Sequence, residues 1–222
     1  MEVEIRNIKR KYGKKKVLQG VDLTCHGGQC IGILGANGSG KSTLLSILAG
    51  VALRDDGAFY CDGRELFSDY KRRTRMVGYV PQGNPLLEEL TAWDNLRMWY
   101  EGETLRKELE SGVLKMLGVD GFLKVPVNKM SGGMKKRLSI GCAMANRPPI
   151  LLLDEPTAAL DLACKQDITD YLKAYKASGG LLLLVTHDVM ELELCDALYI
   201  LKDGRLEPYQ YDGDLNKLVQ SL

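Results

Sequence analysis

The N-terminal part of the chain carries the pattern of β-structure. Residues 2–8 alternate apolar and charged side chains, and residues 17–24 are rich in strand-forming residues, with Gly13 in a lysine-rich turn between the two segments. This order predicts an antiparallel hairpin. Residues 30–34, CIGIL, are nearly continuously apolar, which predicts a buried central strand.

The apolar period changes from two to that of a helix along the middle of the chain. Residues 42–48 follow a glycine-rich loop with helical spacing, and residues 58–61 and 76–80 are further short strand candidates. From residue 88 to 117 no strand pattern occurs, and apolar residues recur at helical spacing. We predict a helical lobe over residues 85–130, inserted into an α/β core.

Strands and helices alternate again after the lobe. We predict strands at 150–153, 181–185 and 198–201, with helices at 163–175 and 189–195 between them. Such alternation predicts an α/β fold with a mostly parallel sheet covered by helices on both faces. The chain is then a single domain, 1–222, whose core comprises residues 1–84 and 131–222.

Composition narrows the functional classes. The chain is 45% hydrophobic with a net charge of +1, whereas proteins that neutralise nucleic-acid phosphates are usually more basic, so no nucleic-acid partner is expected. The longest apolar runs are too short to cross a bilayer, and no targeting segment precedes the first strand, which predicts a cytoplasmic location. The six cysteines form no Cys-x-x-Cys pair, a poor basis for a zinc site.

The strongest local motif is an eight-residue match to the P-loop pattern, placed between a predicted strand and a predicted helix. It consists of Gly35, Ala36, Asn37, Gly38, Ser39, Gly40, Lys41 and Ser42. Backbone N–H groups of such a loop, together with the helix N-terminus, bind phosphate. Lys41 would reach the β- and γ-phosphates, and the Ser42 hydroxyl would bind Mg²⁺. The alternative, a glycine-rich turn that happens to contain a lysine, does not explain this context.

Two adjacent carboxylates, Asp154 and Glu155, end the apolar strand at 150–153. Acidic groups at the end of a buried strand are costly unless a metal or a reacting group uses them. Asp154 suits Mg²⁺, and Glu155 suits the orientation and deprotonation of a water molecule. The alternative is a strand exit with two solvated acids.

A third motif, Ser131, Gly132 and Gly133, precedes an apolar helix at 138–145. A hydroxyl and free N–H groups at a helix N-terminus can bind a phosphate. Taken alone, the motif favours an ordinary N-capped helix with glycines in the preceding turn.

In this order, the motifs resemble the nucleotide-binding domain of ABC ATPases over almost the whole chain. The resemblance implies a P-loop NTPase core with an N-terminal antiparallel β subdomain and an inserted helical lobe, binding ATP and Mg²⁺. It identifies Walker A at 35–42, Walker B at Asp154 and Glu155, and the signature at 131–133.

The resemblance also assigns roles to single residues. It implies that Tyr12 stacks on adenine with Val17 on the strand beside it, and that Thr43, directly after Walker A, binds ATP. It also implies that Gln82 binds Mg²⁺ in the Q-loop, that Asp161 belongs to the D-loop, and that His187 is the switch histidine contacting the γ-phosphate. The signature departs from the family pattern, because Met130 and Met134 stand where Leu and Gln are usual.

The family's mechanism implies partners. Walker A of one subunit and the signature of a second nucleotide-binding subunit enclose one ATP, so we expect an ATP-dependent homodimer or heterodimer. A separate transmembrane permease subunit would contact Gln82 and the lobe, placing the protein on the inner face of the membrane. Residues 90–96 resemble the lobe entrance of export-type ATPases. The alternative is a soluble ABC-family ATPase that serves a non-transport assembly.

Two features remain open at this stage. Trp93 and Trp99 are expected on one helix, packing within the lobe or facing a partner. The basic residues at 9–11 and 14–16 are interpreted as a solvated hairpin edge, with a nucleic-acid or lipid-headgroup patch as the alternative.

Overall fold

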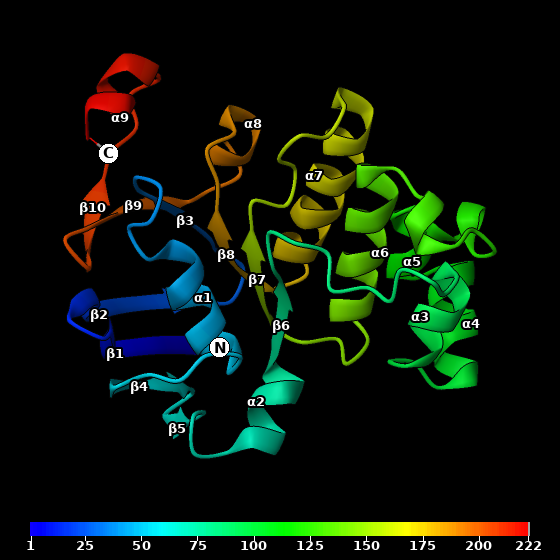
Figure 1. The fold of residues 1–222 in the computed structure, drawn as a ribbon, viewed down its shortest axis with the longest axis horizontal. Coiled ribbons are helices and arrows are strands. Elements are labelled where there is room, and N and C mark those ends of the chain that lie inside the picture. Colours follow the sequence, from blue (N-terminus) through cyan, green and yellow to red (C-terminus); the bar gives the residue numbers. More distant parts are fainter. Residues whose placement is uncertain (222) are drawn as a thin grey trace.

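The computed structural model describes residues 1–221 and contains two sheets flanked by helices (Figure 1). The strands are β1 (Glu2–Tyr12), β2 (Lys15–His26), β3 (Cys30–Leu34), β4 (Asp56–Cys61), β5 (Arg64–Glu65), β6 (Val77–Val80), β7 (Ile150–Asp154), β8 (Leu181–Val185), β9 (Ala197–Lys202) and β10 (Arg205–Tyr209). The helices are α1 (Lys41–Ala49), α2 (Tyr70–Met76), α3 (Ala92–Arg97), α4 (Gly102–Glu110), α5 (Val113–Met116), α6 (Gly132–Ala143), α7 (Leu162–Ala177), α8 (Val189–Leu192) and α9 (Leu215–Ser221), with 3₁₀ turns η1 (Val119–Phe122) and η2 (Val127–Lys129).

The larger sheet is mostly parallel, as predicted. Its strand order is β10-β9-β3-β8-β7-β6, and every neighbouring pair is parallel except β9 with β10. Alternate residues of the central strands face opposite sides: Leu151 and Leu153 enter one core, while Ile150 and Leu152 enter the other. The continuous apolar runs therefore reflect burial on both faces.

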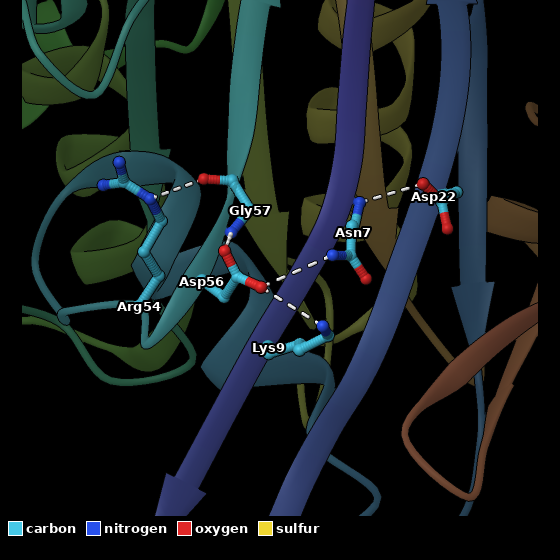
Figure 2. Close-up of polar contacts among 6 residues, drawn as sticks. All are labelled: Asn7, Lys9, Asp22, Arg54, Asp56 and Gly57. Atoms are coloured by element: carbon cyan, nitrogen blue, oxygen red, sulfur yellow. Dashed lines mark hydrogen bonds and ion pairs between the residues drawn. The ribbon is translucent and has the colours of Figure 1, made fainter.

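The smaller sheet is antiparallel, with the order β2-β1-β4-β5, and together with α1 it covers one face of the parallel sheet. A polar cluster fixes an irregularity in β1 near its middle (Figure 2). Asn7 adopts φ +51° there, and its N–H donates to Asp22 at 2.8 Å. Asp56 accepts from the Lys9 ammonium at 3.1 Å and from the Gly57 N–H at 2.8 Å. The antiparallel pairing of β1 with β2 confirms the predicted N-terminal hairpin, and Asp56 pairs with Lys9 of its basic edge.

Helices α6 and α7 cover the opposite face of the parallel sheet, and the helical lobe packs outside them, far from the antiparallel strands in Figure 1. Its buried residues, such as Leu96, Leu114 and Phe122, form one continuous core with α6, α7 and the strand residues Leu151 and Leu182. The lobe therefore shares its core with the sheet. Its predicted boundaries at residues 85 and 130 stay a prediction.

Several predicted helices and one predicted strand extend beyond the elements in the structure. Trp99 does not lie on the helix of Trp93: α3 ends at Arg97, and Trp99 lies in a turn in which its N–H donates to the carbonyl of Leu96 at 2.9 Å. The helix predicted for 189–195 ends at Leu192, and the strand predicted from residue 76 begins at Val77. In each case the apolar spacing continues beyond the hydrogen-bonded element.

Within residues 1–221, no helix is both long enough and apolar enough to span a bilayer. Five of the six cysteines are buried and Cys195 is partly buried, so they act as small core residues.

Candidate nucleotide-binding site

The predicted motifs meet at one edge of the parallel sheet. Strands β3, β8, β7 and β6 are neighbours in that order and run parallel, so their carboxyl ends point the same way. The segments that follow them carry the P-loop, His187, Glu155 and Gln82, respectively. This edge is the usual ligand site of open α/β sheets.

The P-loop backbone requires glycine at its last turn. Gly40 has φ +111°, and a Cβ there would lie 2.8 Å from Cγ1 of Val17. Gly40 is also the N-cap of α1, which has no side-chain cap. The first N–H groups of α1 are therefore not used by a capping side chain and face the loop interior as an anion site.

Lys41 lies inside this loop with only 6% of its surface exposed. Its ammonium donates to the carbonyls of Gly35 at 2.6 Å and Ala36 at 3.1 Å. Burial lowers the pKa of Lys41, while the carboxylates of Glu155 and Asp154 oppose that shift. A cation held against carbonyl groups in this way is poised to bind a more strongly charged anion such as a phosphate.

A cleft of about 560 Å³ opens beside the P-loop. It brings together Tyr12, Val17, Asn37, Gly38, Gly40, Lys41, Ser42, Thr43, Gln82 and Glu155, all predicted site residues, and also Lys15. Ala36 and Ser39 line an adjoining cavity of about 370 Å³. Gly35 lines neither cavity, and its carbonyl accepts a hydrogen bond from the Lys41 ammonium.

Tyr12 lies at the cleft rim, and Arg10 supports its ring. The Arg10 guanidinium lies 4.5 Å from the ring centroid, and its Nη1 pairs with Asp55 at 3.1 Å. Asp55 also accepts the N–H of Lys11 at 2.7 Å, so the strand backbone and the guanidinium are held by one carboxylate. Tyr12 remains 49% exposed, with surface available for stacking.

Asp154 and Glu155 differ in burial and role. Asp154 is 2% exposed, and burial raises its pKa; Glu155 adds to the shift, while the Ser42 hydroxyl and Lys41 counter it. Glu155 adopts φ +48°, and its N–H donates to the carbonyl of Val185 at 2.9 Å, which ties the ends of β7 and β8 together. A positive φ at a non-glycine residue is uncommon and turns this carboxylate into the cleft.

Gln82 contacts Glu155 directly. The Gln82 amide nitrogen donates to Oε2 of Glu155 at 3.0 Å. Because the nitrogen is engaged there, the amide oxygen is the end of Gln82 that can bind a cation.

His187 lies on the far side of Glu155, outside the main cleft. It lines a separate cavity of about 230 Å³, the switch cavity, with Glu155, Lys165 and Glu191. Desolvation and the nearby Lys41 ammonium lower the pKa of His187, while Glu155 opposes the shift. The imidazole is therefore mainly neutral at pH 7, able to donate one hydrogen bond and accept another.

The signature and the D-loop residue do not reach this cleft. Ser131 caps α6 by accepting the N–H of Met134 at 3.2 Å, and Asp161 caps α7 by accepting the N–H of Cys164 at 2.9 Å. Gly132 and Gly133 begin α6. Met134, the unusual signature residue, is partly buried against the shared core. None of these residues lines the nucleotide cleft.

Sequence reasoning missed two lysines at this edge. Lys15 lines the cleft, although it was assigned to a solvated hairpin edge. Lys136 is 4% exposed and donates to the carbonyls of Pro81 and Gln82. Its spacing from Gly133 and Ile140, both buried, was a signal for the buried face of α6.

Comparison with known proteins agrees with this geometry. Residues 18–158 match the family model described as ABC transporter. The chain is 36% identical over 209 residues to the Nod factor export ATP-binding protein I of Sinorhizobium fredii (strain NBRC 101917 / NGR234), covering 91% of this chain but only 61% of that relative's length. It is 32% identical over 219 residues to the lantibiotic transport ATP-binding protein SrtF of Streptococcus pyogenes, covering 96% of this chain and 93% of the relative.

Among solved structures, the ATP-binding cassette MJ0796, determined as a dimer in a post-hydrolysis state bound to ADP and Pi, superposes with a TM-score of 0.82 at 31% identity. The alignment covers 96% of this chain and all of that one. Because the family model spans more than half of the chain and the relatives exceed 30% identity over most of it, the chain belongs to the ABC transporter family.

Proposed function

We propose that the chain is the ATP-binding and ATP-hydrolysing subunit of an ABC transporter, which powers export by a separate membrane subunit. One observation carries the proposal: Lys41, Ser42, Gln82 and Glu155 line one cleft, with Asp154 buried at the Ser42 hydroxyl. The names of the similar proteins, which concern Nod factor export and lantibiotic transport, support export.

ATP would lie along the cleft with its base at Tyr12 and its phosphates in the P-loop. The exposed Tyr12 ring offers a stacking surface for adenine, with Val17 beside it. The N–H groups of the loop and the first turn of α1, with Lys41, balance the phosphate charges. Thr43 lines the cleft one residue into the helix, close to the phosphate position.

The residues around Ser42 fit a magnesium ion. The Ser42 hydroxyl, the Gln82 amide oxygen and the Asp154 carboxylate are hard oxygen donors, the type that Mg²⁺ prefers. Asp154 is buried with a raised pKa, a state that a nearby cation would reverse. When bound, Mg²⁺ would neutralise charge on the phosphate oxygens.

Glu155 would act as the base toward water. Its Oε2 is engaged by Gln82, which fixes the carboxylate's orientation beside the P-loop. Water would attack the γ-phosphorus while Glu155 accepts its proton; the bond to the β–γ bridging oxygen breaks, giving ADP and phosphate. His187, which lines the switch cavity of about 230 Å³ beside Glu155, would hydrogen-bond a γ-phosphate oxygen.

A second nucleotide-binding subunit would complete the site. Ser131, Gly132 and Gly133 begin a helix but do not line the cleft of their own chain, which is consistent with a role on a partner's ATP. Asp161, at the start of α7, would lie at the same interface. The dimeric cassette MJ0796 supports this arrangement.

The membrane partner would dock on the helical lobe, which would hold the chain at the inner face of the membrane. Trp93, Met98 and Trp99 are exposed there, at 37%, 53% and 60%. An apolar cavity of about 340 Å³ lies between Trp93 and Leu123. Exposed aromatic and methionine side chains are typical anchors at protein interfaces.

The transporter role is tested by tagged purification from detergent-solubilised native membranes. We expect a multi-span membrane protein to co-purify in stoichiometric amount, and Trp99→Ala to reduce its yield without changing ATP affinity. Purification with soluble assembly factors and no membrane protein would support the alternative of a non-transport ATPase.

A further inference from the structure

Lys136 makes two contacts that neither the P-loop chemistry nor the capping of α6 requires. Its ammonium donates to the carbonyls of Pro81 at 3.0 Å and Gln82 at 3.1 Å. Lys136 belongs to the second turn of α6, which begins at the signature Gly132, and the two acceptors follow directly after β6. One side chain therefore joins the signature helix to the segment that carries Gln82.

The burial of Lys136 argues against an incidental surface contact. The residue is 4% exposed, and a buried ammonium carries a desolvation cost unless it is well hydrogen-bonded. Burial lowers its pKa, while Asp154, Glu191 and Glu155 attract the cation and oppose that shift. Two backbone acceptors thus hold the ammonium, and the carboxylates of Asp154, Glu155 and Glu191 favour its charge.

The contacts continue from Lys136 to the catalytic carboxylate. The Gln82 backbone is held by Lys136, and the Gln82 side chain donates to Oε2 of Glu155 at 3.0 Å. Residues 82–85 are exposed, so this segment has little packing of its own to fix it. Without Lys136, the Gln82 side chain would sample more positions relative to Glu155.

We infer that Lys136 is a positioning residue that clamps the Gln82 segment to the signature helix, so that the position of α6 sets the alignment of Gln82 with Glu155. The inference rests on the proposed ATPase function. It means that engagement of Ser131–Gly133 with a partner's phosphate acts, through the same helix, on the water-activating group of its own chain.

The test is steady-state ATP hydrolysis by the wild-type chain and by Lys136→Met, Lys136→Arg and Lys135→Met. Met has a similar length but no donors, and misplacing a catalytic group costs roughly 10- to 100-fold in kcat. We expect that loss for Lys136→Met with KM for ATP nearly unchanged, and recovery of most activity in Lys136→Arg. Lys135→Met is the matched control on the same helix, because Lys135 faces Glu88 at 3.6 Å, and it should behave as wild type.

Amide hydrogen exchange supplies a readout that does not depend on turnover. Lys136→Met should accelerate exchange at residues 82–84, whereas Lys135→Met should not. A wild-type kcat in Lys136→Met, or unchanged exchange at 82–84, would overturn the clamp. If the wild-type chain hydrolyses no ATP above the level of Glu155→Gln, the proposed function fails, and the exchange result alone decides whether Lys136 holds the segment.

Discussion

The first turns of α1 and α6 are both proposed to bind the γ-phosphate, yet they are built differently. Gly40 begins α1 in a left-handed conformation with no side-chain cap, whereas Ser131 caps α6 with its own hydroxyl. Each helix also carries a buried lysine that donates to two backbone carbonyls: Lys41 within its own loop, and Lys136 to the Gln82 segment.

We expect this difference to give the two helices different tasks: nucleotide binding for α1 and response to a partner subunit for α6. The P-loop leaves its N–H groups for a ligand and keeps its lysine beside them, so one chain can bind nucleotide. The signature turn satisfies its own N–H group through Ser131 and directs its lysine inward, toward the catalytic segment. Under the proposed function, α1 would bind ATP in its own chain, and α6 would respond to contact with a partner.

The largest expected effect comes from exchanging the two lysines for methionine. Lys41→Met should raise the Kd for ATP about 10- to 150-fold, since a hydrogen bond to a charged group contributes about 1.5–3 kcal/mol. Lys136→Met should leave the Kd near the wild-type value and lower kcat. Nucleotide titration by calorimetry checks both, and equal losses of affinity would remove the distinction between the helices.

Ser131→Ala should separate the capping role from the partner role. Loss of the cap costs about 1 kcal/mol of stability. ATP affinity of the single chain should stay unchanged, while the ATP-dependent dimer of the hydrolysis-deficient Glu155→Gln background should be lost in light scattering. Asp69→Ala removes the comparable cap of α2, where Asp69 accepts the N–H of Arg72 at 2.9 Å, and should keep the dimer. Retention of the dimer in Ser131→Ala would contradict the role in trans.

A substitution at the rim of the cleft should change the Kd for ATP by a smaller factor. Arg10→Ala removes the guanidinium from the Tyr12 ring, an interaction of about 0.5–1 kcal/mol at exposed sites, so the Kd for ATP should rise about two- to fivefold. Affinity for inorganic tripolyphosphate, which has no base, should not change. Arg54→Ala, which removes a similar stack on Phe67 at 4.0 Å, serves as the control. Equal weakening of ATP and tripolyphosphate would rule out support of base stacking.

The smallest effect concerns stability and pH. Burial raises the pKa of Asp154 in the folded chain, so the folded state binds this proton more tightly than the unfolded state does. The stabilising effect of the protonated form is complete below the unfolded value and is lost as pH rises through the folded value. Asp154→Asn should therefore raise the melting temperature near pH 7 but not at pH below 3.8, the ordinary value of the group. A lower melting temperature of Asp154→Asn at pH 7 would show that the buried carboxylate does not destabilise the folded chain.

Much of the fold follows from strong local patterns. The apolar runs in β3, β7 and β8 predicted buried parallel strands because Leu182 and Leu183 face different cores and both must be apolar. The P-loop and Asp154-Glu155 could be proposed as site residues from the sequence, because their residue types and their place after a strand are typical of nucleotide sites.

The missed elements carry weak apolar signals. Helix α2 has no buried residue and therefore no apolar period to detect. Strand β10 contains Pro208, which is tolerated because β10 is the edge of its sheet. Lys136 received no role from the sequence, because its acceptors at Pro81 and Gln82 are 55 and 54 residues away along the chain.

The most direct test of the central claim is single-turnover hydrolysis of ATP by wild type and Glu155→Gln, with the Kd for ATP measured in parallel. The matched control is Glu193→Gln, which changes an exposed glutamate six residues after His187. Since a general base contributes roughly 10²- to 10⁴-fold, we expect the rate to fall by that factor in Glu155→Gln, with nearly unchanged Kd. A wild-type rate in Glu155→Gln would contradict the assignment of the base and, with it, the catalytic reading of the cleft.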